Sequence, residues 1–247
     1  MSVFDLSRVG AVVRTELRDY RRKRAIIVGM VILPCLFLVE PTVAIFFIAG
    51  SNSGIDQYVV FPLLSLLLIP VFTPPTLAAY TVAGEREQGT LEPLLTTPIT
   101  KEEFILGRAA AVMLPTVALS YVISGLFLAA VRLFASAAVA TAVFQHGPIL
   151  IGMVLFTPLL AAWAIWVGMA VSVRANEVRV AQQLGMLSGL SAVGMVVLVA
   201  LGDIQPTFNF AVKFAIVLLA IDVASLRVVS RMFDRERLVT GNKPVRS

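Results

Sequence analysis

The chain has 247 residues, of which 58% are hydrophobic and 14% are charged, and its mean hydropathy is +0.91. Soluble domains average about 45–50% apolar and about 25% charged residues, so this composition excludes an ordinary soluble protein. It predicts an all-α integral membrane protein, in which residues 1–247 form one transmembrane domain with no separate soluble domain. The net charge of +5 does not point to nucleic acid, because membrane proteins gather basic residues on one side of the bilayer.

The first segment, residues 1–24, is predicted to be an amphipathic helix on the cytoplasmic face of the membrane. Five apolar residues follow helical spacing and three arginines lie on a more polar side: Leu6, Val9, Val13, Leu17 and Tyr20, and Arg14, Arg18 and Arg21. Arginines in such a position interact with anionic lipid headgroups. A plain basic tail is the alternative interpretation.

Six apolar segments follow, and each has the roughly 20 residues that a bilayer crossing requires. They are residues 25–49, 58–83, 109–131, 149–173, 181–201 and 208–226. Glu40-Pro41 interrupts the first segment, and Thr73-Pro74-Pro75 is expected to kink or break the second. Residues 133–145 are too few to cross and predict a short external helix. Residues 227–247 form a tail that begins as a helical continuation of the last span.

The distribution of Lys and Arg predicts the orientation. If both termini are cytoplasmic, 18 of the 20 basic residues lie on the cytoplasmic side, and only Arg132 and Lys213 lie elsewhere. The positive-inside rule therefore predicts a multi-pass protein of the cell membrane, with both termini and residues 85–103 in the cytoplasm.

Residues 80–108 form the longest polar interruption, between the second and third predicted spans. Gly89 ends any helix that leaves the second span, Thr90 can cap a new short helix, and Pro98 stops that helix. The apolar face of this short helix is formed by Leu91, Leu94 and Leu95.

The helix after this interruption has its own start signal. Thr100 and Glu103 occupy the two positions of a capping box, and Ile99 and Phe104 occupy the positions of a hydrophobic staple. The sequence thus predicts a short amphipathic helix held between two stiff spans. Such an element can transmit force from a partner that grips it.

The polar interruption contains the string Gly84-Glu85-Arg86-Glu87-Gln88-Gly89-Thr90-Leu91-Glu92-Pro93-Leu94-Leu95, followed by Thr97-Pro98 and Gly107-Arg108. Together with the six-span pattern, it resembles the signature of type-2 ATP-binding-cassette (ABC) exporter permeases. The resemblance implies that residues 84–100 hold a coupling helix that docks on a separate ATPase subunit. It also implies a second permease subunit, identical or different, and ATP and Mg bound by the ATPase. The residues implied in coupling are Gly84, Glu85, Arg86, Glu87, Gln88, Gly89, Thr90, Leu91, Glu92, Leu94 and Leu95.

The chain carries no catalytic signature of its own. It has no G-x-x-x-x-G-K-[ST] string, no H-E-x-x-H string, no paired-Cys metal signature and a single histidine, His146. The sequence therefore predicts a non-enzymatic subunit without a cofactor or metal site. Its energy source is expected in a partner subunit or an ion gradient, and a membrane-embedded enzyme is the least favoured class.

Two carboxylates at membrane depth are candidates for a translocation path. Glu40 lies in the outer half of the first span and Asp222 in the inner half of the last. A carboxylate in a span is costly unless it pairs, is protonated or faces a cavity, so each residue has a functional and a structural interpretation. Pro74 and Pro75 likewise form either a functional helix break or a packing kink. An ion-coupled secondary transporter or channel that uses Glu40 and Asp222 is the alternative to an ABC permease.

Overall fold

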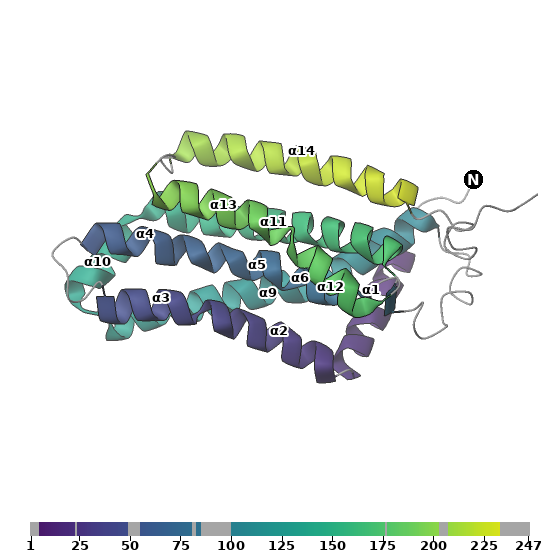
Figure 1. Ribbon diagram of the computed structural model, residues 1–247, viewed down its shortest axis with the longest axis horizontal. Coiled ribbons are helices and arrows are strands. Elements are labelled where there is room, and N and C mark those ends of the chain that lie inside the picture. Colours follow the sequence, from purple (N-terminus) through teal and green to yellow (C-terminus); the bar gives the residue numbers. More distant parts are fainter. Residues whose placement is uncertain are drawn as a thin grey trace, which may run out of the picture.

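The computed structural model describes residues 5–22, 24–48, 55–80, 83–84, 100–175, 177–202 and 207–232. These residues form helices and no strand. Figure 1 shows an elongated bundle in which most helices run along the long axis. The predicted all-α class is confirmed for the part of the chain that the structure describes.

The helices follow one another in the order of the predicted segments. They are α1 (Leu6–Arg22), α2 (Arg24–Phe37), α3 (Val39–Val43), the π-helix η1 (Ala44–Ile48), α4 (Ile55–Ser65), the 3₁₀ helix η3 (Leu66–Leu68), α5 (Ile69–Phe72), α6 (Pro74–Ala78), α9 (Lys101–Phe134), α10 (Ala137–Gln145), α11 (Gly147–Arg174), α12 (Val178–Met186), α13 (Gly189–Ala200) and α14 (Phe208–Met232).

Among the described residues, five helical stretches are long and apolar enough to cross a membrane. They are Ile27–Phe47, Val59–Ala78, Glu102–Phe134, Gly147–Arg174 and Val178–Val199. The predicted sixth span, α14, is not among these five, although its 25 residues form one helix that packs along α11. Six crossings therefore remain a prediction, whereas five membrane-length helices are observed.

The outside of the bundle is rich in exposed large apolar side chains. Examples are Val31 of α2, Leu126 of α9, Leu190 of α13 and Ile216 of α14, with exposed fractions between 47% and 66%. Exposure of such a surface to water along the whole length of a bundle is energetically unfavourable, whereas its exposure to lipid tails is not. The exposed face therefore matches a protein that is embedded in a bilayer.

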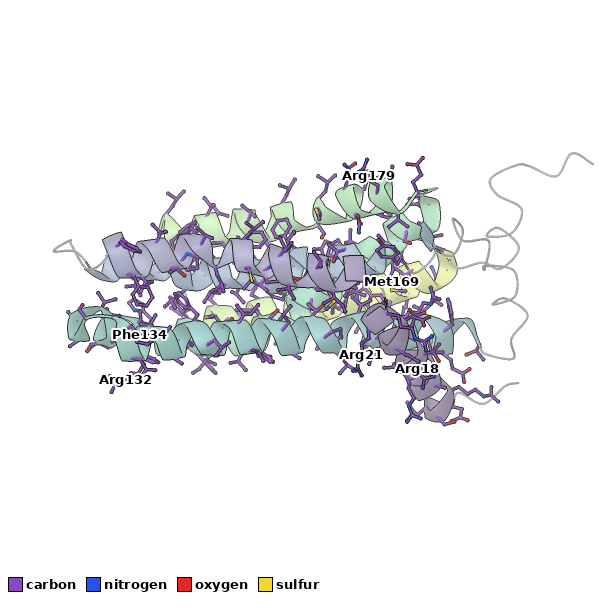
Figure 2. The ribbon with its side chains drawn as sticks, turned by 90° about the horizontal axis from the view of Figure 1, so that it is seen from below. Arg18, Arg21, Arg132, Phe134, Met169 and Arg179 are labelled. Carbon is purple, nitrogen blue, oxygen red and sulfur yellow. The ribbon has the colours of Figure 1, made fainter. Side chains whose placement is uncertain are left out.

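The basic side chains are separated along the long axis. Figure 2 shows Arg18, Arg21 and Arg179 at one end of the bundle and Arg132 at the other. We call the first of these ends the basic end. It is the end at which α1, the start of α9 and the end of α11 lie (Figure 1).

Prolines break the first and second spans where the sequence predicts breaks. Helix α2 ends at Phe37, four residues before Pro41, because a proline lacks an N–H and its ring clashes with the carbonyl of residue i−4. The second span breaks at Thr73, immediately before Pro74 and Pro75. The 3₁₀ turn η3 adds a further irregularity that the sequence analysis did not anticipate.

Two spans differ in detail from their predicted ranges. The fifth span, predicted over residues 181–201, divides at Leu187-Ser188 into α12 and α13. Ser188-Gly189 is the type of pair at which helices kink, and at Gly189 a Cβ would lie 2.3 Å from the Phe72 ring. The third span, predicted over residues 109–131, is part of the longer helix α9, which runs unbroken from Lys101 to Phe134 and starts after the predicted cap Thr100.

The ends of the chain follow the predicted pattern in the described residues. Helix α1 is the predicted amphipathic helix, with exposed Arg14 and Arg18 and a buried Tyr20. Helix α10, over residues 137–145, corresponds to the short helix predicted over residues 133–145, whose first two residues belong to α9. Helix α14 continues past residue 226 to Met232, and the rest of the tail lies outside the described residues.

Candidate functional site at the basic end

The site begins with the two flanks of the predicted coupling segment. The implied coupling residues Glu85, Arg86, Glu87, Gln88, Gly89, Thr90, Leu91, Glu92, Leu94 and Leu95 lie outside the described residues, as does Ile99. Gly84 closes the described part of the incoming flank, and Thr100 opens the outgoing flank. What the structure describes is how the bundle holds each flank.

A serine from α11 is inserted into the helical ladder of the incoming flank. The Ser172 hydroxyl donates to the Ala79 carbonyl at 2.9 Å and accepts from the Ala83 N–H at 3.0 Å. In a regular helix these two backbone groups would bond to each other, since they are four residues apart. All three residues are buried, so the hydroxyl replaces a helix bond and ties the end of the second span to α11.

A glutamine from α12 holds the preceding turn. The Tyr80 N–H bonds to the Leu77 carbonyl at 3.0 Å, which leaves the Thr76 carbonyl without its regular i+4 donor. The Gln182 amide donates to this carbonyl at 3.2 Å. The incoming flank is therefore fixed by side chains from two neighbouring helices.

Pro74 and Pro75 are buried in the contact between the second span and these same helices. At Gly168 of α11 a Cβ would lie 2.8 Å from the Ala78 Cβ, and at Gly185 of α12 it would lie 3.1 Å from the Pro75 Cβ. The two glycines permit an approach that larger residues would prevent. Pro75 thus lies at a tight helix crossing beside the buried Pro74, and the role of both prolines in translocation stays a prediction.

The outgoing flank starts with the predicted capping box, and both of its bonds are present. The Thr100 hydroxyl accepts from the Glu103 N–H at 3.2 Å, and the Glu103 carboxylate accepts from the Thr100 N–H at 2.9 Å. The Glu103 side chain is completely buried. Its second oxygen accepts from the Asp5 N–H at 2.7 Å, and Arg8 Nη1 lies 3.8 Å from the carboxylate. One carboxylate therefore caps α9 and ties it to the beginning of α1.

An ion pair joins the same two helices further along, at Arg108 of α9 and Glu16 of α1. Arg108 Nη2 lies 2.9 Å from Glu16 Oε1, and the arginine side chain is only 4% exposed. The Arg108 guanidinium also lies 4.4 Å from the centre of the Phe104 ring, within the range of a cation–π contact. Breaking a buried pair of this kind leaves an uncompensated charge, so it fixes α1 against α9.

Apolar packing closes the contact between α1 and α9. Val13, Leu17 and Tyr20 of α1 pack with Ile105 and buried neighbours of α9 and α11. A Cβ at Gly107 would lie 2.7 Å from the Val12 side chain, so the helices cross closely there. The sequence analysis identified the apolar face of α1 correctly but assigned it to the membrane surface. In the structure much of this face packs on protein.

These surroundings shift the pKa values of two residues near the ends of α1, Tyr20 and Asp5. Burial, and then the neighbouring Glu16 carboxylate, raise the pKa of the Tyr20 phenol well above its usual value. The Asp5 pKa is lowered, chiefly by the hydrogen bond that its carboxylate accepts from the Ser7 N–H at 2.8 Å. Tyr20 therefore stays neutral and Asp5 stays ionised at physiological pH.

The two carboxylates singled out at membrane depth have different surroundings. Glu40 lies on an exposed position of α3, and its Oε2 accepts from the Ser65 hydroxyl at 2.6 Å. Asp222 is 6% exposed on the face of α14 that packs on α11, and neither of its oxygens has a hydrogen-bond partner among the described residues. The structure does not bring these two residues together into one site.

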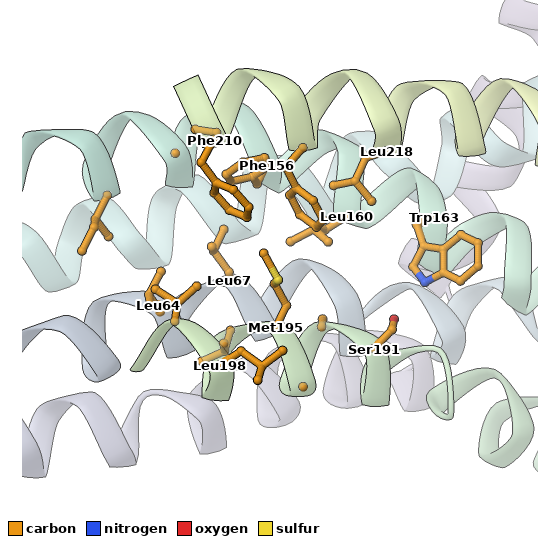
Figure 3. Close-up of a pocket in the computed structure, with 18 of the residues that line it drawn as sticks. Leu64, Leu67, Phe156, Leu160, Trp163, Ser191, Met195, Leu198, Phe210 and Leu218 are labelled. Carbon is orange, nitrogen blue, oxygen red and sulfur yellow. The ribbon is translucent and has the colours of Figure 1, made fainter. Parts of the chain in front are cut away.

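A cavity of about 470 Å³ lies beside the buried face of α14 (Figure 3). Its walls are almost entirely apolar and come from α4, η3, α11, α13 and α14. Sequence reasoning missed this cavity, since apolar residues that line a cavity and apolar residues that face lipid carry the same hydropathy signal.

The helices described so far define a multi-pass α-helical membrane protein. A family model for ABC-2 family transporter proteins matches residues 12–180, and the chain belongs to this family. The match begins in α1 and ends in α12, so it includes both flanks of the predicted coupling segment but not α13 or α14. The resemblance that the Gly84–Leu95 string suggested is thus confirmed. The chain has no significant match among curated protein sequences.

Proposed function

We propose that this chain is the permease subunit of an ABC exporter, driven by a separate ATPase subunit that binds ATP and Mg. The observation that carries the proposal is the family match over residues 12–180, which includes the string from Gly84 to Leu95. The chain contributes the membrane path and the coupling segment. The substrate crosses the membrane when ATP binding and hydrolysis close and open the ATPase pair.

The two anchored flanks suggest how movement reaches the membrane. In the proposal, the ATPase binds the apolar face formed by Leu91, Leu94 and Leu95, as in helix-in-groove recognition. Displacement of the segment then pulls on α11 and α12 through Ser172 and Gln182. On the other side it moves α9 together with α1, because Glu103 and Arg108 join these helices.

The proposed assembly has two permease subunits, identical or different, and two ATPase subunits. Each permease has six spans, with α14 as the sixth; its 25 residues correspond to about 37 Å, more than the hydrocarbon thickness of about 30 Å. Both termini and residues 85–103 are cytoplasmic in the cell membrane. The gathering of Arg18, Arg21 and Arg179 at the basic end supports this orientation.

An ion-coupled transporter or channel is the second candidate function. Asp222 supports it, because a buried carboxylate without a partner among the described residues is a potential cation or proton site. Glu40 supports it less, since its carboxylate is exposed and already accepts a hydrogen bond from Ser65. This candidate requires no ATPase subunit.

The substitution Leu94→Asp tests the ABC proposal. It places a charge on the apolar face, where burial of one Leu is worth about 1.5–3 kcal/mol, so we expect loss of ATPase binding and of ATP-driven transport. Thr96→Asp adds the same charge away from that face and serves as the matched control. The measurements are pull-down of the ATPase subunit and the melting temperature of the permease alone. An unchanged pull-down with a lowered melting temperature would mean that Leu94 packs on the permease itself, and would overturn the coupling assignment.

A further inference from the structure

The cavity beside α14 has an apolar body with one polar end. Figure 3 shows Phe210 towards one end, Leu160, Leu218 and Met195 in the middle, and Trp163 with Ser191 at the other end. We call the second end the polar end. It lies on the side from which α13 begins, and therefore faces the basic end of the bundle.

One unpartnered polar atom lies at the polar end, and a second belongs to a residue that is bonded to its wall. Among the described residues, the buried Trp163 Nε1 and the buried Ser188 Oγ have no hydrogen-bond partner. Ser188 is joined to the cavity wall, because the Ser191 hydroxyl donates to its carbonyl at 2.8 Å. In a protein interior such groups are normally paired, so their presence at one end of a cavity indicates that a ligand completes them.

Asp222 lies at the same height as Trp163 along the long axis of the bundle. Helices α11 and α14 run in the same direction, and their register is set by the Phe156–Phe214 ring contact at 5.4 Å. Trp163 lies seven residues after Phe156, and Asp222 lies eight residues after Phe214, so both are about 11–12 Å further along. Asp222 also lies one turn beyond Leu218 on the buried face of α14, next to Ile221, which lines the cavity.

The Asp222 carboxylate determines which class of ligand this end of the cavity can bind. An ionised carboxylate that is buried without a partner is strongly disfavoured, and a cation beside it removes most of that penalty. The indole of Trp163 offers a second favourable surface for a cation. The apolar body of the cavity, by contrast, accepts only a hydrocarbon group, and its 470 Å³ lies within the usual range of small-molecule sites.

We propose that this cavity binds a long-chain alkyl cation, with its hydrocarbon chain between α13 and α14 and its cationic head at Asp222 and Trp163. The proposal names the class of substrate for the proposed transport function. The ligand is a substrate only if the chain is a transporter, so this part of the proposal rests on the proposed function. Binding itself requires neither nucleotide nor an ATPase subunit. The cavity is bordered by exposed residues of α13 and α14, so a ligand can reach it sideways from the bilayer.

Equilibrium binding of radiolabelled dodecylammonium to the full-length chain in lipid nanodiscs tests the proposal, with empty nanodiscs subtracted. We expect saturable binding that Asp222→Asn weakens about ten-fold or more, which corresponds to the loss of one charge-assisted hydrogen bond. Dodecanol, the neutral probe of the same chain length, should compete weakly and should compete equally well in both proteins.

Two variants separate the cavity from a general charge effect. Glu40→Gln removes the other carboxylate at membrane depth and should leave dodecylammonium affinity within about two-fold, a small change on the scale of one charged contact. Gly194 borders the cavity and has open space where a Cβ would lie, so the side chain of Gly194→Leu should occupy part of the apolar body and weaken binding. Melting temperatures of the variants report whether each is folded, and Asp222→Glu, which keeps the charge, should retain binding if Asp222→Asn does not fold.

The results either support or overturn the site. Binding that does not saturate above empty nanodiscs, or that is unchanged by Asp222→Asn or by Gly194→Leu, overturns it. A chain that binds the cation but does not transport with an ATPase subunit refutes the exporter proposal and leaves this site intact. A chain that transports other compounds but fails to bind the cation refutes only the site.

Discussion

Replacement of Ser172 by alanine removes the hydroxyl that bridges the Ala79 carbonyl and the Ala83 N–H. Both backbone groups are buried, and each loses a hydrogen bond of 2.9 or 3.0 Å. At a net value of about 0.5–1.5 kcal/mol for each bond, the expected loss of unfolding free energy is about 2 kcal/mol. For a chain of this size, that corresponds to a fall in melting temperature of about 4–8 °C.

Ser120→Ala is the matched control for this prediction. Ser120 is as fully buried as Ser172, but its hydroxyl donates to the Thr116 carbonyl within the same helix at 2.8 Å. That carbonyl keeps its regular partner in the helical ladder, so we expect a change below about 0.5 kcal/mol. The assay is thermal unfolding of the purified permease in detergent, combined with transport by the assembled complex.

The two alanine variants should also differ in function. Ser172→Ala loosens the incoming flank of the coupling segment, so we expect lower transport per ATP hydrolysed at an unchanged ATPase content. Ser120→Ala should transport like the natural protein. Equal melting temperatures for the two variants would refute the inference that the inserted hydroxyl stabilises the end of the second span.

The remaining predictions concern α1 and the orientation of the bundle. Glu103→Ala removes a buried carboxylate that caps α9 and holds α1, so it should lower the melting temperature and expose α1 to proteolysis, whereas exposed Glu102→Ala should change neither. In a Cys35→Ser background, a membrane-impermeant thiol reagent added to intact cells should label a cysteine at exposed Ser136 but not one at exposed Ser7. Labelling of both positions, or of the one at Ser7 alone, would contradict the proposed orientation.

The local features of the fold could be predicted from the sequence. The capping box at Thr100 and Glu103 depends on residues three positions apart, and both predicted bonds are present. The breaks before Pro41 and Pro74 follow from the missing N–H of proline. Each of these signals is complete within a few residues, so no knowledge of the tertiary structure is needed to interpret it.

The tertiary contacts of the site could not be predicted in this way. Glu103 bonds to a residue 98 positions away, and Ser172 bonds to groups 89 and 93 positions away. The sequence around a serine in an apolar span does not indicate which other helix its hydroxyl will bond to. The break at Ser188 was missed for the same reason, since it becomes evident only where Gly189 meets Phe72.

The cavity shows a limit that is specific to membrane proteins. In a soluble protein, polar residues lie on the solvent-exposed face of a helix, so the apolar face can be identified as the buried one. In a bilayer, the lining of a cavity and the lipid-facing surface are both apolar. Asp222 was identified because it is charged, but Leu218 and Met195 beside the cavity are indistinguishable from their lipid-facing neighbours in the sequence.

The unbroken course of α9 has a mechanical consequence. The second span is divided by η3 and by the break at Thr73, whereas α9 continues for 34 residues, or about 51 Å, with Pro115 inside it. The predicted coupling segment thus joins a compliant arm to a stiff one. The compliant arm absorbs a displacement as local bending, but the stiff arm tilts as a lever, and a tilt of about 5° moves its far end, at Phe134, by about 4 Å. In the proposed mechanism, a push applied at Thr100 therefore reaches the opposite end of the bundle mainly along α9.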